Sequence, residues 1–257
     1  MTPYYDESGI TIFLGDCLEI MKSIPDGSVD CVCADPPYGR TSCAWDSVIP
    51  FAPMWEQVQR IIKPKGAIVL FGSQPFTSAL VMSNPGMFRY EWVWEKSGGT
   101  GFLDANRKPL RCHENIMVFA TGNTTYNPQK RQGISNHTRI PAAYGLTSSL
   151  YRGSYDSPPA DVSGMKYPRS VMKFPKHPAN ETLHPTQKPV ALMDYLVKTY
   201  TNAGDTVLDF SMGSGTTLVA AKHLGRRAIG IEISEKYIEI AIKRLQQEVF
   251  DFDEVRA

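Results

Sequence analysis

Short apolar runs alternate with amphipathic helical patterns on both sides of the middle of this 257-residue chain. The runs that have the length and composition of buried strands are 11–16, 29–34, 67–72, 90–96, 114–120, 205–210 and 227–233. Helical patterns occupy 17–24, 51–62, 74–83, 189–200, 216–224 and 235–249. Because strands that alternate with helices pair in parallel, the sequence predicts an α/β fold with a doubly wound, mostly parallel sheet.

The middle of the chain, residues 121–182, has a different composition. Pro, Gly, Ser, Asn and Tyr are frequent there, and eight Lys or Arg residues stand against three Asp or Glu, whereas the whole chain carries only +1. We therefore divide the chain into 1–120 and 183–257, which form one domain together, and an inserted irregular region between them. This region is either a solvated loop or a surface that faces phosphates.

The cysteines point to a reducing, cytosolic setting. The five are odd in number and lack the paired C-x-x-C spacing of a zinc site, so we predict no metal. Cys31 and Cys33 are expected on one face of a strand as small buried residues. The N-terminus is polar and no apolar run has membrane-spanning length, so neither secretion nor a membrane anchor is expected.

The apolar run 29–34 ends in Asp35-Pro36-Pro37-Tyr38. Two successive prolines cannot continue a sheet ladder, and each fixes its own φ angle, so the backbone is rigid where it presents a carboxylate and an aromatic ring. These residues are also typical of an ordinary turn at a strand end. On its own, this segment does not decide between a turn and a site.

A second motif, DFSMGSGTT at 209–217, lies between a predicted strand and a predicted helix. Gly213 and Gly215 stand where a backbone turns tightly or lets a ligand approach. Glu232 ends the next strand, 23 positions after Asp209. In nucleotide-binding α/β folds, an acid at this place accepts hydrogen bonds from the ribose hydroxyls. The third glycine of the dinucleotide fingerprint is missing, and so is a phosphate-loop lysine, which favours a nucleoside without a diphosphate. There are two alternatives to a ligand site: the glycines form only a turn, and Glu232 only caps the helix that begins near Ser234.

Taken together, these motifs resemble the S-adenosylmethionine-dependent DNA amino-methyltransferases. HPTQKP at 184–189, GDCLEIMKSIPDGSVD at 15–30 and HENIMVF at 113–119 match further family segments, and the resemblance covers most of residues 10–247 except the basic middle. The proline motif precedes the glycine loop, which resembles the circularly permuted β class. The resemblance implies double-stranded DNA as substrate, a base swung out of the duplex, and methyl transfer to adenine N6.

The resemblance also implies roles for particular residues. Asp35 and the Pro36 carbonyl would each accept one N–H of the target amine and direct its lone pair at the methyl group, while Tyr38 stacks on the base. The residues expected to bind the cofactor are Asp16, His184, Thr186, Lys188, Asp209, Phe210, Gly213, Gly215, Thr216 and Glu232. The resemblance further implies that 121–182 is the region that recognises and binds the target DNA. The residues expected to bind DNA, as a group, are Lys130, Arg131, Arg139, Arg169 and Lys173.

Several alternatives stay open at this point. Cytosine N4 is an alternative target, because it has the same amine geometry as adenine N6. In this family, however, an Asp at the position of Asp35 is found mostly in enzymes that methylate adenine. Methylation of glutamine in proteins is another alternative. Enzymes of that kind usually have Asn-Pro-Pro-Tyr at this motif, whereas this chain has Asp35 at the first position. A DNA-binding regulator that has kept only the fold is a further alternative. The recognised bases, an endonuclease partner, and monomer against homodimer are not readable from the sequence.

Overall fold

The computed structural model describes residues 1–40, 46–133, 164–176 and 187–247. The chain separates into two units, of which the first comprises Met1–Asn127 together with Ser170–Ala257 and the second is Pro128–Arg169. The second unit lies within the predicted insertion, 121–182. It contains a short antiparallel pair, β7 (Arg131–Gln132) with β8 (Met165–Lys166).

Within the described residues, the first unit is built on one nine-stranded sheet. In spatial order its strands are β1 (Tyr5–Glu7), β2 (Ile10–Leu14), β11 (Arg227–Glu232), β10 (Thr206–Asp209), β3 (Val29–Ala34), β4 (Ile62–Gly72), β6 (Arg111–Phe119), β5 (Phe88–Thr100) and β9 (Val171–Lys173). The neighbours from β2 to β4 all run parallel. β6 is antiparallel to both β4 and β5, and β1 is antiparallel to β2.

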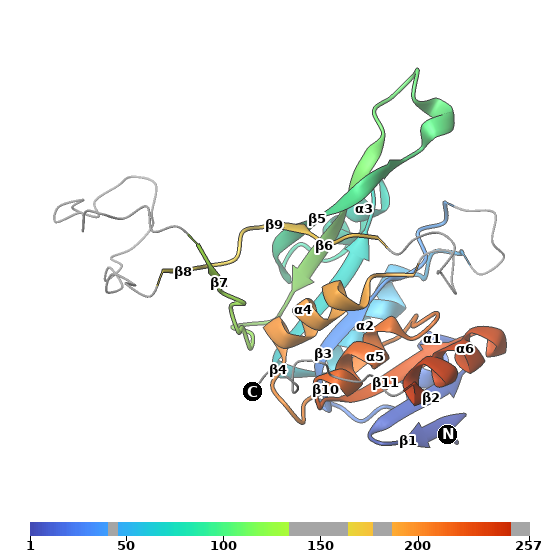
Figure 1. Ribbon diagram of the computed structural model, residues 1–257. Coiled ribbons are helices and arrows are strands. Elements are labelled where there is room, and N and C mark those ends of the chain that lie inside the picture. Colours follow the sequence, from blue (N-terminus) through green and yellow to red (C-terminus); the bar gives the residue numbers. More distant parts are fainter. Residues whose placement is uncertain (41–45, 134–163, 177–186, 248–257) are drawn as a thin grey trace. The chain divides into compact units, whose positions relative to one another are not determined.

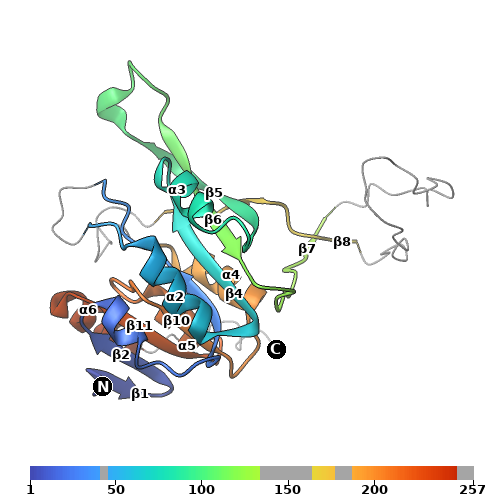
Figure 2. The same ribbon diagram turned by 180° about the vertical axis from the view of Figure 1, so that it is seen from behind.

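Helices cover both faces of this sheet. One face carries α1 (Cys17–Met21), α2 (Phe51–Ile61) and α3 (Phe76–Ser83), and the other carries α4 (Val190–Tyr200), α5 (Thr216–His223) and α6 (Glu235–Gln246). Figure 1 shows the face with α4, α5 and α6, and Figure 2, which views the molecule from the opposite side, shows α2 and α3. The doubly wound, mostly parallel fold predicted from the sequence is therefore confirmed.

The alternation of side chains along β3 explains why both faces are covered. Cys31 and Cys33 pack into the apolar cluster beneath α4, α5 and α6, whereas Val32 and Ala34 pack into the cluster beneath α1, α2 and α3. A strand buried on both sides reads as a continuous apolar run, as residues 29–34 do. The prediction that Cys31 and Cys33 share one buried face is confirmed.

Two details of the fold differ from the pattern in the sequence. β4 begins at Ile62, directly after α2, and so includes the KPKG segment that we expected to be a connection. β9 comes from the range predicted to be irregular, but it pairs in parallel with β5 and joins the sheet. A strand of three residues at a sheet edge has too few positions to show an alternation in sequence. No helix in the described part of the chain is long and apolar enough to cross a membrane.

Candidate active site

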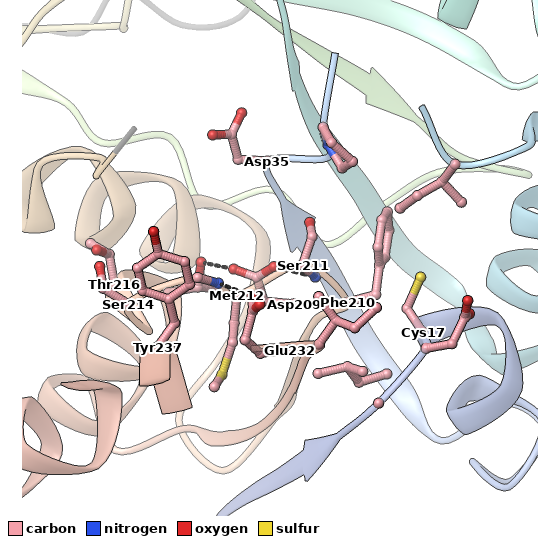
Figure 3. A pocket seen from close by; sticks show the side chains of 18 of the residues that line it. Cys17, Asp35, Asp209, Phe210, Ser211, Met212, Ser214, Thr216, Glu232 and Tyr237 are labelled. Atoms are coloured by element: carbon pink, nitrogen blue, oxygen red, sulfur yellow. Dashed lines mark hydrogen bonds between the residues drawn. The ribbon is translucent and has the colours of Figure 1, made fainter. Parts of the chain in front are cut away.

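The ends of four parallel strands, β2, β11, β10 and β3, meet at one edge of the sheet, and a cavity of about 320 Å³ lies there. The edge brings together acids that are far apart in sequence: Glu232 ends β11, Asp209 ends β10, and Asp16 and Asp35 follow β2 and β3. Crevices at the carboxyl ends of strands are the usual ligand sites of open α/β sheets. Figure 3 shows the labelled side chains around this cavity.

The glycine loop between β10 and α5 forms one wall of the cavity. Gly213 and Gly215 have φ angles of +50° and +74°, a region that disfavours other residues. A side-chain carbon at Gly215 would lie 2.7 Å from the side chain of Ala241 in α6, so this position also lets two helices approach. The tight turn predicted at these glycines is present.

Glu232 accepts two backbone hydrogen bonds, one from the glycine loop and one from the start of α6. Its Oε2 accepts the Gly213 N–H at 2.9 Å, and its Oε1 accepts the Ser234 N–H at 2.9 Å, just before α6. The capping contact and the position at the cavity, which the sequence presented as alternatives, therefore occur together. Burial raises the pKa of Glu232, while these hydrogen bonds act in the opposite direction.

Asp209 is buried and bonded on both oxygens. Oδ1 accepts the Ser211 N–H at 3.1 Å and Oδ2 accepts the Thr217 hydroxyl at 2.5 Å. Burial raises the pKa of this carboxyl to about 7, which the hydrogen bond from Thr217 only partly opposes. The contacts of Asp209 thus shape the loop, and the neighbouring Ser211 Oγ is a buried cavity-lining atom that has no hydrogen-bond partner within the described residues.

Most residues predicted to bind the cofactor line this one cavity. Asp16 lines it and caps α1 by accepting the Leu18 N–H at 2.7 Å. The others that line it are Lys188, Asp209, Phe210, Gly213, Thr216 and Glu232. Gly215 caps α5 in the same loop, whereas the predicted residues His184 and Thr186 lie outside the described residues.

Asp35 lies across the cavity from the glycine loop, with both of its oxygens in use. The Tyr38 hydroxyl donates to Oδ1 and the Lys188 ammonium donates to Oδ2. Pro36 is buried, Pro37 lines the cavity, and the Tyr38 ring packs against Phe76 with centroids 4.9 Å apart. Burial raises the pKa of Asp35, and the positive charge of Lys188 opposes that rise.

A further carboxylate, that of the half-buried Glu114 on β6, extends this ion pair. Lys188 Nζ lies 3.4 Å from its Oε2, and Lys96 of β5 donates to its Oε1. Although burial alone would raise the pKa of Glu114, Lys188 and Lys96 lower it. Conversely, burial alone would lower the pKa of Lys188, but Asp35 and Glu114 raise it. The result is a chain of alternating charges, Asp35–Lys188–Glu114–Lys96, of which Asp35 and Lys188 line the cavity.

Sequence reasoning assigned no role to Glu114, Lys96 or Tyr237, although Tyr237 of α6 also lines the cavity. Glu114 stands in the HENIMVF segment, where an acid at the start of an apolar strand was the available signal. Lys96 and Tyr237 carry no comparable signal, because a Lys near a strand end and a Tyr on an amphipathic helix are ordinary surface residues.

The residues predicted to bind DNA are divided between the two units. Lys130, Arg131 and Arg169 belong to the second unit, where Lys130 Nζ lies 4.4 Å from the centre of the Tyr167 ring. Lys173 lies on β9 in the first unit and pairs with Glu95 at 3.2 Å. Arg139 lies outside the described residues. Among the described residues there is no cluster of three or more His, Cys, Asp or Glu side chains placed to hold a metal ion.

Comparison with known proteins decides the family. A family model described as DNA methylase, of the N6/N4 type, matches residues 29–243, which include the proline motif, the glycine loop and Glu232. The chain belongs to the N6/N4 DNA methylases. The resemblance stated from the motifs is thereby confirmed, and DNA is the substrate of the family.

Curated relatives agree with this assignment over most of their length. The methylase is 30% identical to "Type II methyltransferase M.HpaI" of Haemophilus parainfluenzae, covering 95% of this chain and 76% of that protein. It is 31% identical to "DNA adenine methyltransferase YhdJ" of Escherichia coli K12, covering 91% and 82%.

Solved structures show the same fold. The complex of M1.HpyAVI with SAM (S-adenosylmethionine) superimposes with a TM-score of 0.63 at 27% identity, covering 92% of the methylase and all of that chain. The cytosine-N4-specific PvuII DNA methyltransferase superimposes with a TM-score of 0.71 at 15% identity, which shows the fold alone. These matches do not test the order of the motifs, so the β class stays a prediction.

Proposed function

We propose that this methylase transfers a methyl group from S-adenosylmethionine to the N6 amine of adenine at specific sites in double-stranded DNA, with the target base flipped out of the duplex. The observation that carries the proposal is the shared cavity, which has the glycine loop and Glu232 on one side and Asp35 on the other. One relative is named a DNA adenine methyltransferase, and one solved relative is a SAM complex.

The residues of the cavity fit a nucleoside with a charged tail. Carboxylates of Asp16 and Glu232 provide acceptors at the strand ends, Phe210 and Leu18 provide apolar surface, and Ser211 Oγ is an unused buried polar atom. S-adenosylmethionine supplies a methyl group that the positive charge of its sulfur activates. In this proposal Glu232 accepts the ribose hydroxyls, Asp16 faces the adenine, and Gly213 allows close approach of the backbone.

On the other side of the cavity Asp35 prepares the nucleophile. The exocyclic amine of adenine is a weak nucleophile because its lone pair is delocalised into the ring. When Asp35 Oδ and the Pro36 carbonyl each accept an N–H, the lone pair turns away from the ring and toward the methyl group. The N–C bond forms as the C–S bond breaks, and the amine then loses one proton. Tyr38 stacks on the flipped base and offsets part of the unstacking cost.

The ion pair between Asp35 and Lys188 has a consequence for substrate entry. Lys188 and Tyr38 each donate to one oxygen of Asp35, so the target amine either uses a remaining lone pair of the carboxylate or displaces one of these donors. Glu114 lies 3.4 Å from Lys188 Nζ on the other side and can take a larger share of that charge. Lys188 therefore orients Asp35 and favours its ionised form by opposing the rise in pKa that burial causes.

The decisive experiment identifies the methylated nucleoside. The protein is incubated with S-adenosylmethionine carrying a labelled methyl group and with genomic DNA from a methylation-deficient host, and the digested nucleosides are analysed by mass spectrometry. We expect labelled N6-methyldeoxyadenosine. N4-methyldeoxycytidine as the sole product would overturn the adenine assignment, and binding of DNA without any transfer would favour a regulator.

A further inference from the structure

Strands β5 and β6 continue past the edge of the sheet at which the cavity lies. Gly72, the last residue of β4, pairs with Asn115 of β6, so the part of β6 before Asn115 and the paired end of β5 extend beyond β4. Figure 1 shows these two strands extending away from the rest of the sheet. We call residues 97–112 the projecting hairpin. It begins directly beside Lys96 and Glu114, which belong to the charge chain at Asp35.

The tip of the projecting hairpin is apolar and almost fully exposed. The side chains of Phe102 and Leu103 are 80% and 102% exposed. Both lie on the single 3-10 turn η1 (Phe102–Asp104), which begins at Gly101 with φ +91°. Backbone hydrogen bonds from Asp104 N to Gly101 O at 3.0 Å and from Lys108 N to Asp104 O at 3.1 Å give the turn a defined shape. Adjacent exposed apolar side chains on an ordered turn mark an interaction surface.

The segment that follows this tip is basic, whereas residues 97–101 before it carry no charge. The projecting hairpin contains Arg107, Lys108 and Arg111 against the single acid Asp104, which pairs with Lys108 at 2.8 Å. Arg111 donates to Ser73 Oγ at 2.7 Å, so the base of the hairpin is fixed to the loop that follows β4. An apolar tip beside a basic segment matches a nucleic acid, in which stacked bases lie next to a line of phosphates.

We propose that the projecting hairpin enters a groove of the DNA and inserts Phe102 and Leu103 into the base stack beside the target base, with its basic segment facing the phosphates. From Lys96 to Thr100, β5 spans roughly 13 Å at about 3.3 Å per residue, more than the roughly 8.5 Å depth of a major groove. Apolar side chains used as wedges in this way unstack a base step. The inference rests on base flipping in the proposed function, but not on which base is methylated.

The test separates opening of the base pair from chemistry. The methylated site is first read by sequencing DNA treated with the wild-type protein, and two duplexes are then made, one with the target base paired and one with an abasic site opposite it. For Phe102→Ala/Leu103→Ala we expect kcat/KM to fall about 10-fold or more on the paired duplex, because without the wedge unstacking is unassisted. On the duplex with the abasic site most of this decrease should disappear. Met82→Ala, an equally simple truncation of a 71% exposed side chain on α3, should behave like wild type on both duplexes.

Other outcomes overturn the proposal. Equal decreases on both duplexes, or no decrease on either, would show that the tip does not assist opening. A shift from dimer to monomer in sedimentation equilibrium, caused by the same double variant, would instead assign the tip to contact between two copies of this chain. Anisotropy with a fluorescent duplex measures DNA affinity without any transfer, and we expect the double variant to bind at least about 3-fold more weakly. The results can therefore refute the role of the hairpin while methyl transfer is confirmed, and they can refute methyl transfer while the hairpin is still shown to bind DNA.

Discussion

The Lys188 ammonium donates to the Asp35 carboxylate at the edge of the cavity, although 153 positions separate the two residues in sequence. The side chains are only 9% and 21% exposed, so water screens the pair weakly. Removing one partner of such a pair leaves a poorly compensated charge and changes the protonation of the other. The first two predictions follow from this relationship.

Replacing Asp35 should abolish methyl transfer without loss of the cofactor. Asp35→Ala removes the acceptor that orients the target amine, and we expect kcat to fall by about 100-fold or more, with the affinity for S-adenosylmethionine measured by calorimetry little changed. Tyr38→Ala should reduce transfer less and weaken capture of the base more. Glu56→Ala, at an exposed position on α2, is the control. Near-normal turnover by a folded Asp35→Ala protein would refute the mechanism.

Replacing Lys188 should change the pH dependence of the reaction. Burial raises the pKa of Asp35 and the charge of Lys188 opposes the rise, so Lys188→Met should raise this pKa further. Since the reaction needs the carboxylate, the acidic limb of the profile of kcat/KM against pH should move to higher pH, and activity should recover as the pH rises. Lys22→Met, an exposed position, should keep the wild-type profile. An acidic limb that stays in place would mean that Lys188 does not tune Asp35.

The cofactor side of the cavity is tested at Glu232 and Gly213. Glu232→Ala removes both the proposed ribose acceptor and the hydrogen bond to Gly213 N. Removing a hydrogen bond to a charged acceptor should cost about 1.5 to 3 kcal/mol, or roughly 10- to 150-fold in affinity for S-adenosylmethionine by calorimetry. Gly213→Val should weaken binding as well, because valine is strained at φ +50°. The control is Glu239→Ala on the exposed side of α6, and unchanged affinity in both folded site variants would refute the cofactor assignment.

Asp209 should make the stability of the fold depend on pH. Folding raises the pKa of this carboxyl from 3.8 to about 7, so the folded state holds the proton more tightly. Its contribution to stability is fully present below the unfolded pKa and is lost as the pH rises through about 7. Asp209→Asn cannot titrate, so between these values wild type should lose about 1.4 kcal/mol of unfolding free energy per pH unit relative to this variant. Urea unfolding at pH 5, 6 and 7 measures the difference, and Asp26→Asn at an exposed position is the control. Unfolding free energies of wild type and Asp209→Asn that change in parallel with pH would contradict the prediction.

The basic residues of the second unit should contribute to the salt dependence of DNA binding. We expect Lys130→Gln/Arg131→Gln/Arg169→Gln to bind duplex DNA more weakly. The slope of log affinity against log salt concentration should become less negative by about 0.9 for each phosphate that the variant no longer neutralises. Affinity for S-adenosylmethionine should not change. Lys173→Gln alone should have a small effect, because Glu95 already offsets its charge at 3.2 Å. An unaltered slope in the triple variant would make this region a solvated loop.

The sequence determined the parts of this protein that depend on neighbouring residues. The apolar run 29–34 became a strand at the predicted bounds, because burial on both faces requires continuous apolar sequence. Gly213 and Gly215 marked a tight turn, because their positive φ angles exclude most other residues. Asp35 and Glu232 were placed correctly at strand ends, and the parallel sheet then brought those ends to one edge.

Only the tertiary structure decided which side chains meet at that edge. β6 lies antiparallel between β4 and β5, which carries Glu114 and Lys96 to Lys188 and lets the projecting hairpin extend beyond the cavity. Strand order and register set these contacts, and a shift of one residue along β6 would turn Glu114 to the opposite face of the sheet. Asp35 and Lys188 stand 153 positions apart, and local sequence patterns do not encode contacts over such a separation, so the ion pair becomes visible only when the sheet is assembled.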